Sequence, residues 1–496
     1  NDVPHIGHAY TTIACDALAR YHRMKGKKVF FLTGTDEHGE KVQKTATQQG
    51  VSPRDLADRV VTRFQGLSAA LDITNDDFIR TTEPRHYASV TELFRRSQAN
   101  GDIYLGEYEG WYCTPCESYW TDLQIGEGKC PDCRRTVERR KEPSFFFRLS
   151  KYQKPLLDYY GKNLSFIRPE SRRNEVASFV AGGLNDLSVS RTSLSWGIPI
   201  PGHPGHVIYV WYDALTNYIT GVGYPGGGER FDTFWPADIH MVGKDILRFH
   251  AVFWPAFLMS AGVAPPLGVF AHGWWTVEGQ KMSKSLGNVI DPYEMVETYG
   301  ADAFRYFLLR EVPFGQDGDF SRKALVHRIN SDLANDFGNL LNRTLGMLGK
   351  YFGGTVPPSS PSGEEDQALV ALSREVADTV DRAMEAVEFH KALSSIWDLV
   401  KAANRYVDVS APWALAKDPA KRDRLGAVLY NLLESARICV LLASPFVPSA
   451  AQKMWEALGC EGAVAAANLS TAGAWGGLRS GVTLPKSAVA FPRIED

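Results

Sequence analysis

The chain has 496 residues, which is enough for several domains with large cores. Its formal net charge is −3 and its pI is near 6.5, so nothing in the composition indicates a general nucleic-acid binder, and any such contact must come from local patches. No apolar run approaches the roughly 20 residues of a membrane span and no signal peptide is visible, so we expect a soluble intracellular protein that contacts no membrane.

The chain opens with a histidine pair at the start of a predicted helix. Residues 5–8 read His-Ile-Gly-His, apolar residues follow at helical spacing from Ala9, and Gly26 closes the helix. The histidines would then lie at a helix N-terminus, where N–H groups and the macrodipole favour an anion. A buried strand predicted at 29–32 completes an order typical of a Rossmann-type α/β unit. Taken alone, the histidine pattern also fits an ordinary turn with surface or metal-binding histidines.

The next stretch places acidic residues where α/β sheets bind ligands. Residues 33–39 follow the predicted strand at its carboxyl end, and Asp36 could hold an ammonium group there. The alternative for Asp36 is a helix cap. A further strand is predicted at 78–82 and a helix at 84–100.

Two Cys-x-x-Cys pairs mark the region 111–191. Thirteen residues separate Cys113 and Cys116 from Cys130 and Cys133, a spacing that suits four thiolates on one tetrahedral Zn²⁺. A disulfide pair is the lesser alternative for an intracellular chain with seven cysteines. Four thiolates leave no open position for water, so we predict structural rather than catalytic zinc.

The α/β pattern resumes after residue 199. A strand is predicted at 207–211, then a helix, a strand at 240–243 and a helix that opens at 244–250 and continues through residue 254. Aromatic side chains gather near these strand ends and helix starts: Trp211, Tyr218, Phe249, His250 and Trp254. Plain core packing is the alternative interpretation of each one.

A second stretch suited to phosphates lies past the middle of the chain. Residues 281–285 read Lys-Met-Ser-Lys-Ser, and Leu-Gly-Asn follows, a composition typical of a mobile loop. Such a lysine pair could close over phosphates as charge develops, whereas the alternative is a solvated basic loop. A reaction that expels pyrophosphate needs such groups from two sides, as the histidine and lysine stretches would provide.

Beyond residue 320 the pattern is helical. Helices are predicted at 325–352, 366–387, 389–409, 419–443 and 448–458, with a Pro/Ser loop at 354–363, which indicates a helix bundle. Asn339 and Arg343 lie four residues apart on one helix face, and Trp413 follows Ala-Pro in a loop. The alternative for Trp413 is a core tryptophan.

The histidine and lysine stretches match, residue for residue, the two signature motifs of class I aminoacyl-tRNA synthetases. Nearly the whole chain resembles the methionyl-tRNA synthetase family, in the cysteine knuckle and in the segments 209–214, 243–254 and 491–495. The isoleucine, valine and leucine relatives carry a large editing insertion, for which the insertion at 111–191 is too short. Leu215 stands where the family often has proline. The family also has a strand just before the histidine motif, and we expect that strand to be missing from this sequence.

The resemblance implies an α/β Rossmann-type parallel-sheet catalytic domain with a zinc-knuckle insertion, followed by an all-α helix bundle. The expected domains are the first Rossmann half at 1–110, the connective insertion with the knuckle at 111–191, the second Rossmann half at 192–275, the lysine loop and connecting fold at 276–325, and an anticodon-binding bundle at 326–496.

The resemblance also implies roles for individual residues. Catalysis would fall to His5, His8, Lys281 and Lys284. ATP would meet these four and Gly7, Ser283, Gly243 and Asp245. Methionine would lie against Trp211, Ala214, Tyr218, Ile246, His250 and Trp254, with its amino group at Asp36. The CAU anticodon would meet Asn339, Arg343 and Trp413, and zinc would be held by Cys113, Cys116, Cys130 and Cys133.

The implied activity is methionine–tRNA ligation. Methionine and ATP, with Mg²⁺, would give methionyl adenylate and pyrophosphate, and the methionyl group would pass to the 3′ end of tRNA(Met) for protein synthesis including initiation. We expect a cytoplasmic monomer, with an organellar matrix as the alternative location. The alternative functions are a nucleotidyl-transferring enzyme that uses no tRNA and a non-catalytic RNA-binding protein that uses only the knuckle and the bundle.

Overall fold

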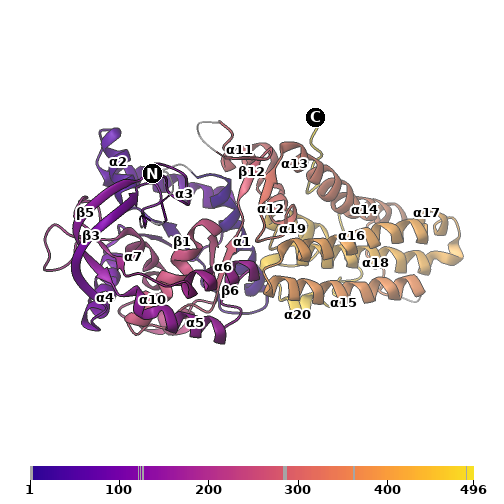
Figure 1. Cartoon of the computed structure of the whole chain (residues 1–496). Helices are drawn as coiled ribbons and strands as arrows, with labels where there is room; N and C mark the ends of the chain where they lie inside the picture. Colours follow the sequence, from indigo (N-terminus) through magenta and orange to yellow (C-terminus); the bar gives the residue numbers. More distant parts are fainter. Residues whose placement is uncertain are drawn as a thin grey trace. The chain divides into compact units, whose positions relative to one another are not determined.

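The computed structural model describes residues 4–120, 122, 124–125, 128–282, 287–360, 363–487 and 489–495. The chain divides into two compact units (Figure 1). The first unit consists of residues 1–4, 30–66 and 75–272, and the second of residues 5–29, 67–74 and 273–496. The predicted domain boundaries stay a prediction.

The first unit is built on short parallel strands. Strand β1 (Leu32–Thr35) pairs with β2 (Asp77–Arg80), and β11 (Val269–His272) pairs with both β10 (His240–Gly243) and β6 (Ile167–Arg168), all in parallel. Parallel strands need crossover connections, which helices supply here. These include α2 (Glu40–Gln48), α3 (Pro53–Ala70), α4 (Pro84–Ala99), α5 (Gln153–Lys162), α6 (Glu170–Ala181) and α10 (Trp254–Ser260). The α/β prediction is confirmed for this part of the chain.

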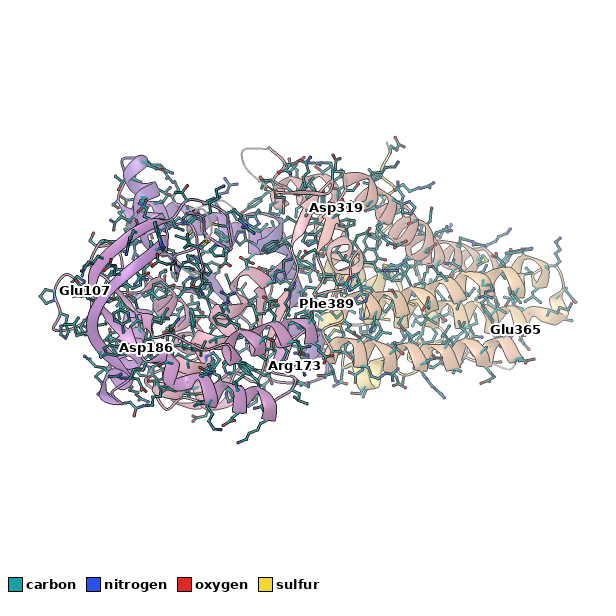
Figure 2. The ribbon with its side chains drawn as sticks, viewed as in Figure 1. Glu107, Arg173, Asp186, Asp319, Glu365 and Phe389 are labelled. Atoms are coloured by element: carbon teal, nitrogen blue, oxygen red, sulfur yellow. The ribbon has the colours of Figure 1, made fainter. Side chains whose placement is uncertain are left out.

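The first unit also contains a four-stranded antiparallel sheet. Its strands run in the order β4 (Ser118–Trp120), β3 (Ile103–Cys113), β5 (Glu138–Phe147) and β7 (Leu187–Ser188). The long β3–β5 ribbon carries exposed charges, among them Glu107, whose carboxylate lies 3.6 Å from Lys141 Nζ (Figure 2). Exposed pairs of this kind contribute little to stability, so the ribbon is held mainly by its hydrogen-bond ladder.

The second unit joins the first helix of the chain to the C-terminal helices. It contains α1 (Ile6–Met24) and a small sheet of β13 (Gln280–Lys281), β12 (Trp275–Val277) and β14 (Gly318–Phe320). Helices α11 (Pro292–Tyr299), α12 (Ala301–Arg310) and α13 (Arg322–Arg328) lead through a π-helical stretch, Ile329–Gly338, into the bundle. The bundle helices α14 (Asn339–Phe352), α15 (Glu364–Glu385), α16 (Phe389–Ser410) and α18 (Arg422–Ala443) run side by side, and α19 (Pro448–Ala457) follows (Figure 1). Phe389, labelled in Figure 2, is fully buried at the start of α16.

The central helix of the bundle is apolar enough to cross a membrane by composition alone. Within the described residues, the 25-residue stretch Pro419–Ala443 is the one that meets this criterion, and its apolar window is entirely buried in the fold. It is therefore the core helix of the bundle. No membrane-length apolar run is visible in the sequence, because Glu434 and Arg437 interrupt the apolar residues. These two side chains form an ion pair at 2.7 Å inside the fold.

A buried ion-pair cluster fixes α1 within the second unit. The Asp16 carboxylate accepts hydrogen bonds from Arg305 at 2.7 Å and Arg20 at 2.8 Å, and the Thr74 N–H donates to it at 2.7 Å. Burial by itself raises the pKa of Asp16, but the two guanidinium groups outweigh that effect and hold the pKa below its ordinary value. The helix that carries the histidine pair is thus anchored by charge as well as by packing.

Two predicted strands are placed differently in the structure. The strand predicted at 29–32 lies at Leu32–Thr35, because its partner β2 begins only at Asp77 and the Phe31 N–H donates instead to the Asp76 carboxylate at 2.7 Å. The strand predicted at 207–211 ends at Ile208, since its neighbour β8 (Ser190–Arg191) has only two residues. Helix α7 (Val210–Leu215) follows at once.

Candidate active site and metal centre

The histidine pair caps the start of α1. His5 Nδ1 accepts the Gly7 N–H at 3.1 Å, and His8 Nδ1 accepts the His5 N–H at 3.2 Å. Because each Nδ1 is an acceptor, the neutral form of each ring carries its proton on Nε2, the tautomer that can donate to a phosphate oxygen. A Cβ at Gly7 would lie 3.0 Å from the His5 ring, so glycine lets this cap close.

The structure brings the histidine turn next to the segment that follows the lysine stretch. The Ile6 N–H donates to the Ile290 carbonyl at 3.3 Å. Lys281 ends β13, which pairs with β12 in the same unit. The predicted phosphate residues Ser283 and Lys284, and the mobile loop predicted around them, lie outside the described residues. The backbone therefore places the histidine turn beside Ile290, five residues after the lysine stretch.

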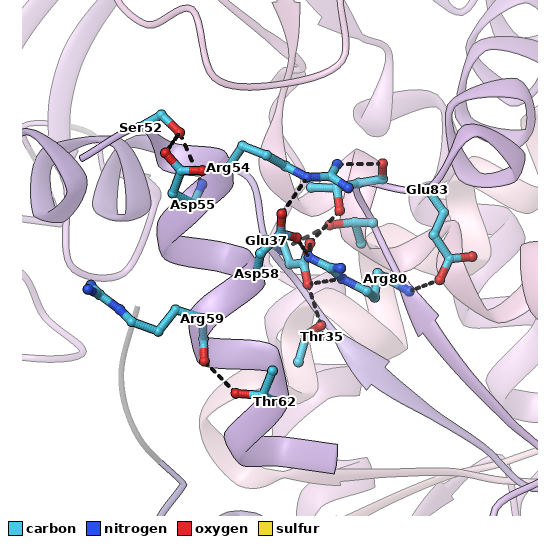
Figure 3. A network of polar contacts seen from close by, with 12 residues as sticks. Thr35, Glu37, Ser52, Arg54, Asp55, Asp58, Arg59, Thr62, Arg80 and Glu83 are labelled. Atoms are coloured by element: carbon cyan, nitrogen blue, oxygen red, sulfur yellow. Dashed lines mark hydrogen bonds and ion pairs between the residues drawn. The ribbon is translucent and has the colours of Figure 1, made fainter. Parts of the chain in front are cut away.

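In the first unit, Asp36 follows β1 and is held through its neighbour Glu37. The buried Glu37 carboxylate accepts hydrogen bonds from Thr35 at 2.8 Å and from Arg80 at 2.8 and 3.0 Å, and the Thr82 hydroxyl also donates to it (Figure 3). Arg80 in turn pairs with Asp58 on α3. This network ties the loop after β1 to the end of β2, so the backbone at Asp36 has little freedom.

Asp36 itself reaches solvent, but protein groups surround it on its other sides. Desolvation and the nearby charge of Asp213 raise its pKa to about 6. A carboxylate in this position favours a positively charged partner, because that partner offsets the repulsion between Asp36 and Asp213. The ammonium-binding role of Asp36 stays a prediction, and Asp36 does not cap α2, whose N-cap is Gly39.

The predicted aromatic cluster forms a connected wall in the first unit. Tyr218 OH donates to His250 Nε2 at 2.8 Å, because His250 Nδ1–H is committed to the Ile246 carbonyl at 2.9 Å. Burial lowers the pKa of His250 to about 4, so the ring is neutral at neutral pH. His250 lies in a π-helical turn, Phe249–Phe253, a feature often found at functional sites.

A second set of contacts completes this wall. The Trp211 ring stacks on Phe249 with centroids 3.8 Å apart, and its buried Nε1–H has no hydrogen-bond partner among the described residues. Trp254 is fully buried and donates to His240 at 3.2 Å, and the His240 ring stacks under Tyr218. Ala214 is buried on α7 next to these rings. His240 was missed by the sequence analysis, since in sequence it belongs to a plain buried strand.

The predicted ATP residues Gly243 and Asp245 lie at the carboxyl end of β10. A Cβ on Gly243 would approach Asp245 Oδ1 to 2.5 Å, so any larger residue would displace that carboxylate. Asp245 is exposed in the turn Lys244–Ile246. The carboxyl edge of a parallel sheet is the usual position for a nucleotide, which agrees with the prediction.

The four predicted cysteines form a compact cluster in the insertion. The sulfur atoms of Cys113, Cys116, Cys130 and Cys133 all lie within 4.8 Å of one another. Two separations are 3.5 Å and 3.9 Å, far longer than a disulfide bond, and all four cysteines are free. Thiolates at Zn–S distances of about 2.3 Å around a tetrahedral ion have sulfur separations of about 3.8 Å. The cluster therefore fits a metal ion, and the disulfide alternative is excluded.

The predicted anticodon residues lie on two helices of the second unit. Asn339 and Arg343 are on α14, and Arg343 reaches Asp408, near the end of α16, at 3.5 Å. Trp413 follows on the short helix α17 (Pro412–Leu415) with 45% of its surface exposed. The alternative of a core tryptophan is thereby excluded.

Comparison with known proteins identifies the family. Residues 1–141 and 134–345 match the model of class I tRNA synthetases (M), and residues 356–496 match the anticodon binding domain of methionyl tRNA ligase. The methionine–tRNA ligase of Caldanaerobacter subterraneus is 52% identical over all of this chain and 77% of its own length, and that of Bacillus subtilis is 50% identical over 92% of this chain and 71% of its own.

A solved structure agrees with these sequence matches. The crystal structure of Mycobacterium tuberculosis methionyl-tRNA synthetase bound by methionyl-adenylate superposes with a TM-score of 0.95 at 47% identity, covering 99% of this chain and 97% of that one. The predicted fold class and the predicted ligase activity are thereby confirmed, and the chain belongs to the methionyl-tRNA synthetase family of class I tRNA synthetases.

Proposed function

We propose that this chain joins methionine to ATP, with release of pyrophosphate, through the residues described above, and then transfers the methionyl group to tRNA(Met). The observation that carries the proposal is the hydrogen bond from Ile6 to Ile290, which joins the histidine turn to the segment after the lysine stretch. The Nε2–H groups of His5 and His8 would donate to phosphate oxygens, and Lys281 and Lys284 would stabilise the leaving pyrophosphate. Catalysis of this kind is mostly positioning and charge stabilisation.

The methionine site would use the two halves of the pocket in different ways. Asp36 would hold the ammonium group, and the wall of Trp211, Tyr218, His250 and Trp254, with Ala214 and Ile246, would enclose the side chain. A neutral His250 supports this assignment, because a charged ring would disfavour an apolar thioether. Sulfur–aromatic contacts are worth about 0.3–1.5 kcal/mol, which favours methionine over an aliphatic side chain of similar size.

The proposed function uses two metal ions, Zn²⁺ and Mg²⁺. Zn²⁺ would be held by the four knuckle cysteines and would stabilise the fold of the insertion. Mg²⁺ would accompany ATP at the site of Gly243 and Asp245 and neutralise phosphate charge. A cytoplasmic monomer is the form that we propose, and the bacterial relatives support that location.

The anticodon would be read at Asn339, Arg343 and Trp413. The exposure of Trp413 supports this, since unstacked bases of single-stranded RNA stack on aromatic rings and meet polar groups along their edges.

We expect Trp413→Ala to affect only reactions in which tRNA takes part. Loss of one stacked base removes about 1–3 kcal/mol, so kcat/KM for tRNA should fall roughly 5- to 150-fold. Methionine-dependent ATP–pyrophosphate exchange should stay near the wild-type rate. Aminoacylation and exchange measured on the same preparation test this.

A matched control is Trp274→Ala, since Trp274 is also exposed, at 38%, but lies far from α17 in sequence. Its kcat/KM for tRNA(Met) should fall less than that of Trp413→Ala. An unchanged kcat/KM for tRNA in Trp413→Ala, or an equal loss in exchange, would contradict the anticodon role.

A further inference from the structure

Three buried titratable residues lie close to Asp36 and have no part in the function proposed so far. Asp213 on α7, His38 in the loop after Asp36, and His86 on α4 are 1%, 5% and 0% exposed. His38 Nδ1 lies 2.6 Å from one oxygen of the Asp213 carboxylate, and His86 Nε2 lies 2.6 Å from the other. We call these three residues the His–Asp–His cluster. Each carboxylate oxygen has one imidazole partner, so the carboxylate is held from both sides.

The outer nitrogen atoms of the two rings also have partners. His38 Nε2 lies 3.1 Å from Tyr87 OH, and His86 Nδ1 lies 3.1 Å from Thr220 Oγ1. A hydroxyl group can donate or accept, so each imidazole can gain or lose a proton without losing a hydrogen bond. The hydrogen bonds of the cluster are therefore compatible with a neutral or a positively charged ring at either histidine.

Burial decides which net charge is favoured. A carboxylate flanked by two neutral imidazoles carries a net charge of −1 away from water, whereas one imidazolium makes the cluster neutral. Burial alone raises the pKa of Asp213, but His38 and then His86 outweigh that effect, and the pKa lies below its ordinary value. The Asp213 carboxylate is thus ionised.

The charge of this cluster acts directly on Asp36. Among the described residues, the charged and titratable groups that act most strongly on Asp36 are Asp213, His86, Glu37 and His38. The charge of Glu37 is balanced by Arg80, which makes two hydrogen bonds to it. After burial, the charge of Asp213 is the main cause of the raised pKa of Asp36, and His86 and His38 oppose it. The charges of the cluster therefore affect how readily Asp36 ionises.

We propose that His38, Asp213 and His86 form a charge-compensating unit that keeps Asp36 ionised, so that Asp36 can hold the ammonium group of the amino-acid substrate. The inference rests on the proposed role of Asp36. The three residues are positioning residues, since they act through Asp36. Because Asp213 is the neighbour of Ala214 on α7, the same helix carries the pocket wall and the group that tunes the ammonium site.

The test is the pH dependence of kcat/KM for methionine in ATP–pyrophosphate exchange. In the wild type, the acid limb should fall near pH 6, because methionine binding is lost as Asp36 takes up a proton. Glutamine at position 86 can donate to Asp213 but cannot carry a charge. His86→Gln removes a group that lowers the pKa of Asp36, so that pKa should rise and the acid limb should move up by about one pH unit. His38→Gln should move it in the same direction, and it replaces His86→Gln if that variant does not fold.

A double variant separates charge from structure. His86→Gln with Asp213→Asn leaves a neutral cluster, so the acid limb should return toward the wild-type position although two buried residues have changed. If the cluster has only a structural role, kcat/KM for methionine should fall further in the double variant than in His86→Gln, and the acid limb should not return toward the wild-type pH. The matched control is His206→Gln, a partly buried histidine of the same unit that bonds Ser190, and its acid limb should match that of the wild type.

Two outcomes separate a failure of the charge-compensating role from a failure of the proposed ammonium-binding role of Asp36. If Asp36→Asn leaves kcat/KM for methionine unchanged, the proposed role of Asp36 is wrong and the inference fails with it. If Asp36→Asn lowers kcat/KM but the limb of His86→Gln and His38→Gln stays at the wild-type pH, or the double variant is shifted further upward, only the charge-compensating role is overturned.

Discussion

Replacing Lys281 by alanine is expected to slow formation of methionyl adenylate by about 100- to 1,000-fold, the usual loss when one preorganised group that stabilises transition-state charge is removed. Methionine affinity should change little, because the lysine acts where charge develops on the phosphates and not on the amino acid. Single-turnover adenylate formation and the equilibrium binding of methionine, measured on one preparation, test both expectations.

The control for this variant is Lys323→Ala. Lys323 is an exposed lysine on α13 of the same unit, and its replacement removes the same charge from the surface. It should leave kcat for exchange within a few-fold of the wild type. If Lys281→Ala also stays within a few-fold, the role assigned to the lysine stretch is wrong.

Loss of a knuckle cysteine should have the second large effect, in this case on folding. Cys116→Ser should lose zinc and lower the unfolding temperature of the insertion, since apparent zinc-binding energies of structural sites are about 10–16 kcal/mol and contribute directly to folding. Metal analysis should find one zinc per wild-type chain and much less in the variant. Protease cleavage within 111–191 should become faster in the variant.

Cys460→Ser is the matched control, because Cys460 is a partly buried free cysteine of the second unit, outside the cluster. It should keep its zinc. Wild-type protein that carries no zinc after growth in zinc-containing medium, or full zinc retention by Cys116→Ser, would refute the structural-zinc assignment.

Local patterns in the sequence predicted much of this fold and site. The cysteine spacing predicted a four-sulfur site, and the four sulfur atoms lie within 4.8 Å of one another. Helical periodicity predicted the ends of α16 to within one residue. The prediction that aromatic residues between 211 and 254 gather in one place was also correct. For α16 the interactions are local and the periodicity carries the information, whereas the cysteine and aromatic groups were predicted from residue type and spacing.

Features that depend on distant partners could not be predicted in this way. The start of β1 depends on Asp76 and Asp77, more than forty residues away, and the length of β9 (Val207–Ile208) depends on the two-residue β8. Similarly, His86 has no local signal, because its partner Asp213 comes from another helix 127 residues later. The residues that tune Asp36 are therefore visible only in three dimensions.

The central claim is that this chain activates methionine, and ATP–pyrophosphate exchange measured with each of the twenty amino acids in the absence of tRNA tests it most directly. We expect exchange that depends on methionine, with isoleucine, leucine and valine far weaker, followed by transfer of methionine to tRNA(Met) once tRNA is added. RNA binding without any methionine-dependent exchange would indicate a non-catalytic RNA-binding protein, and exchange without transfer would indicate a nucleotidyl-transferring enzyme that uses no tRNA. Either result would contradict the assignment of the histidine and lysine stretches to aminoacyl-tRNA synthesis.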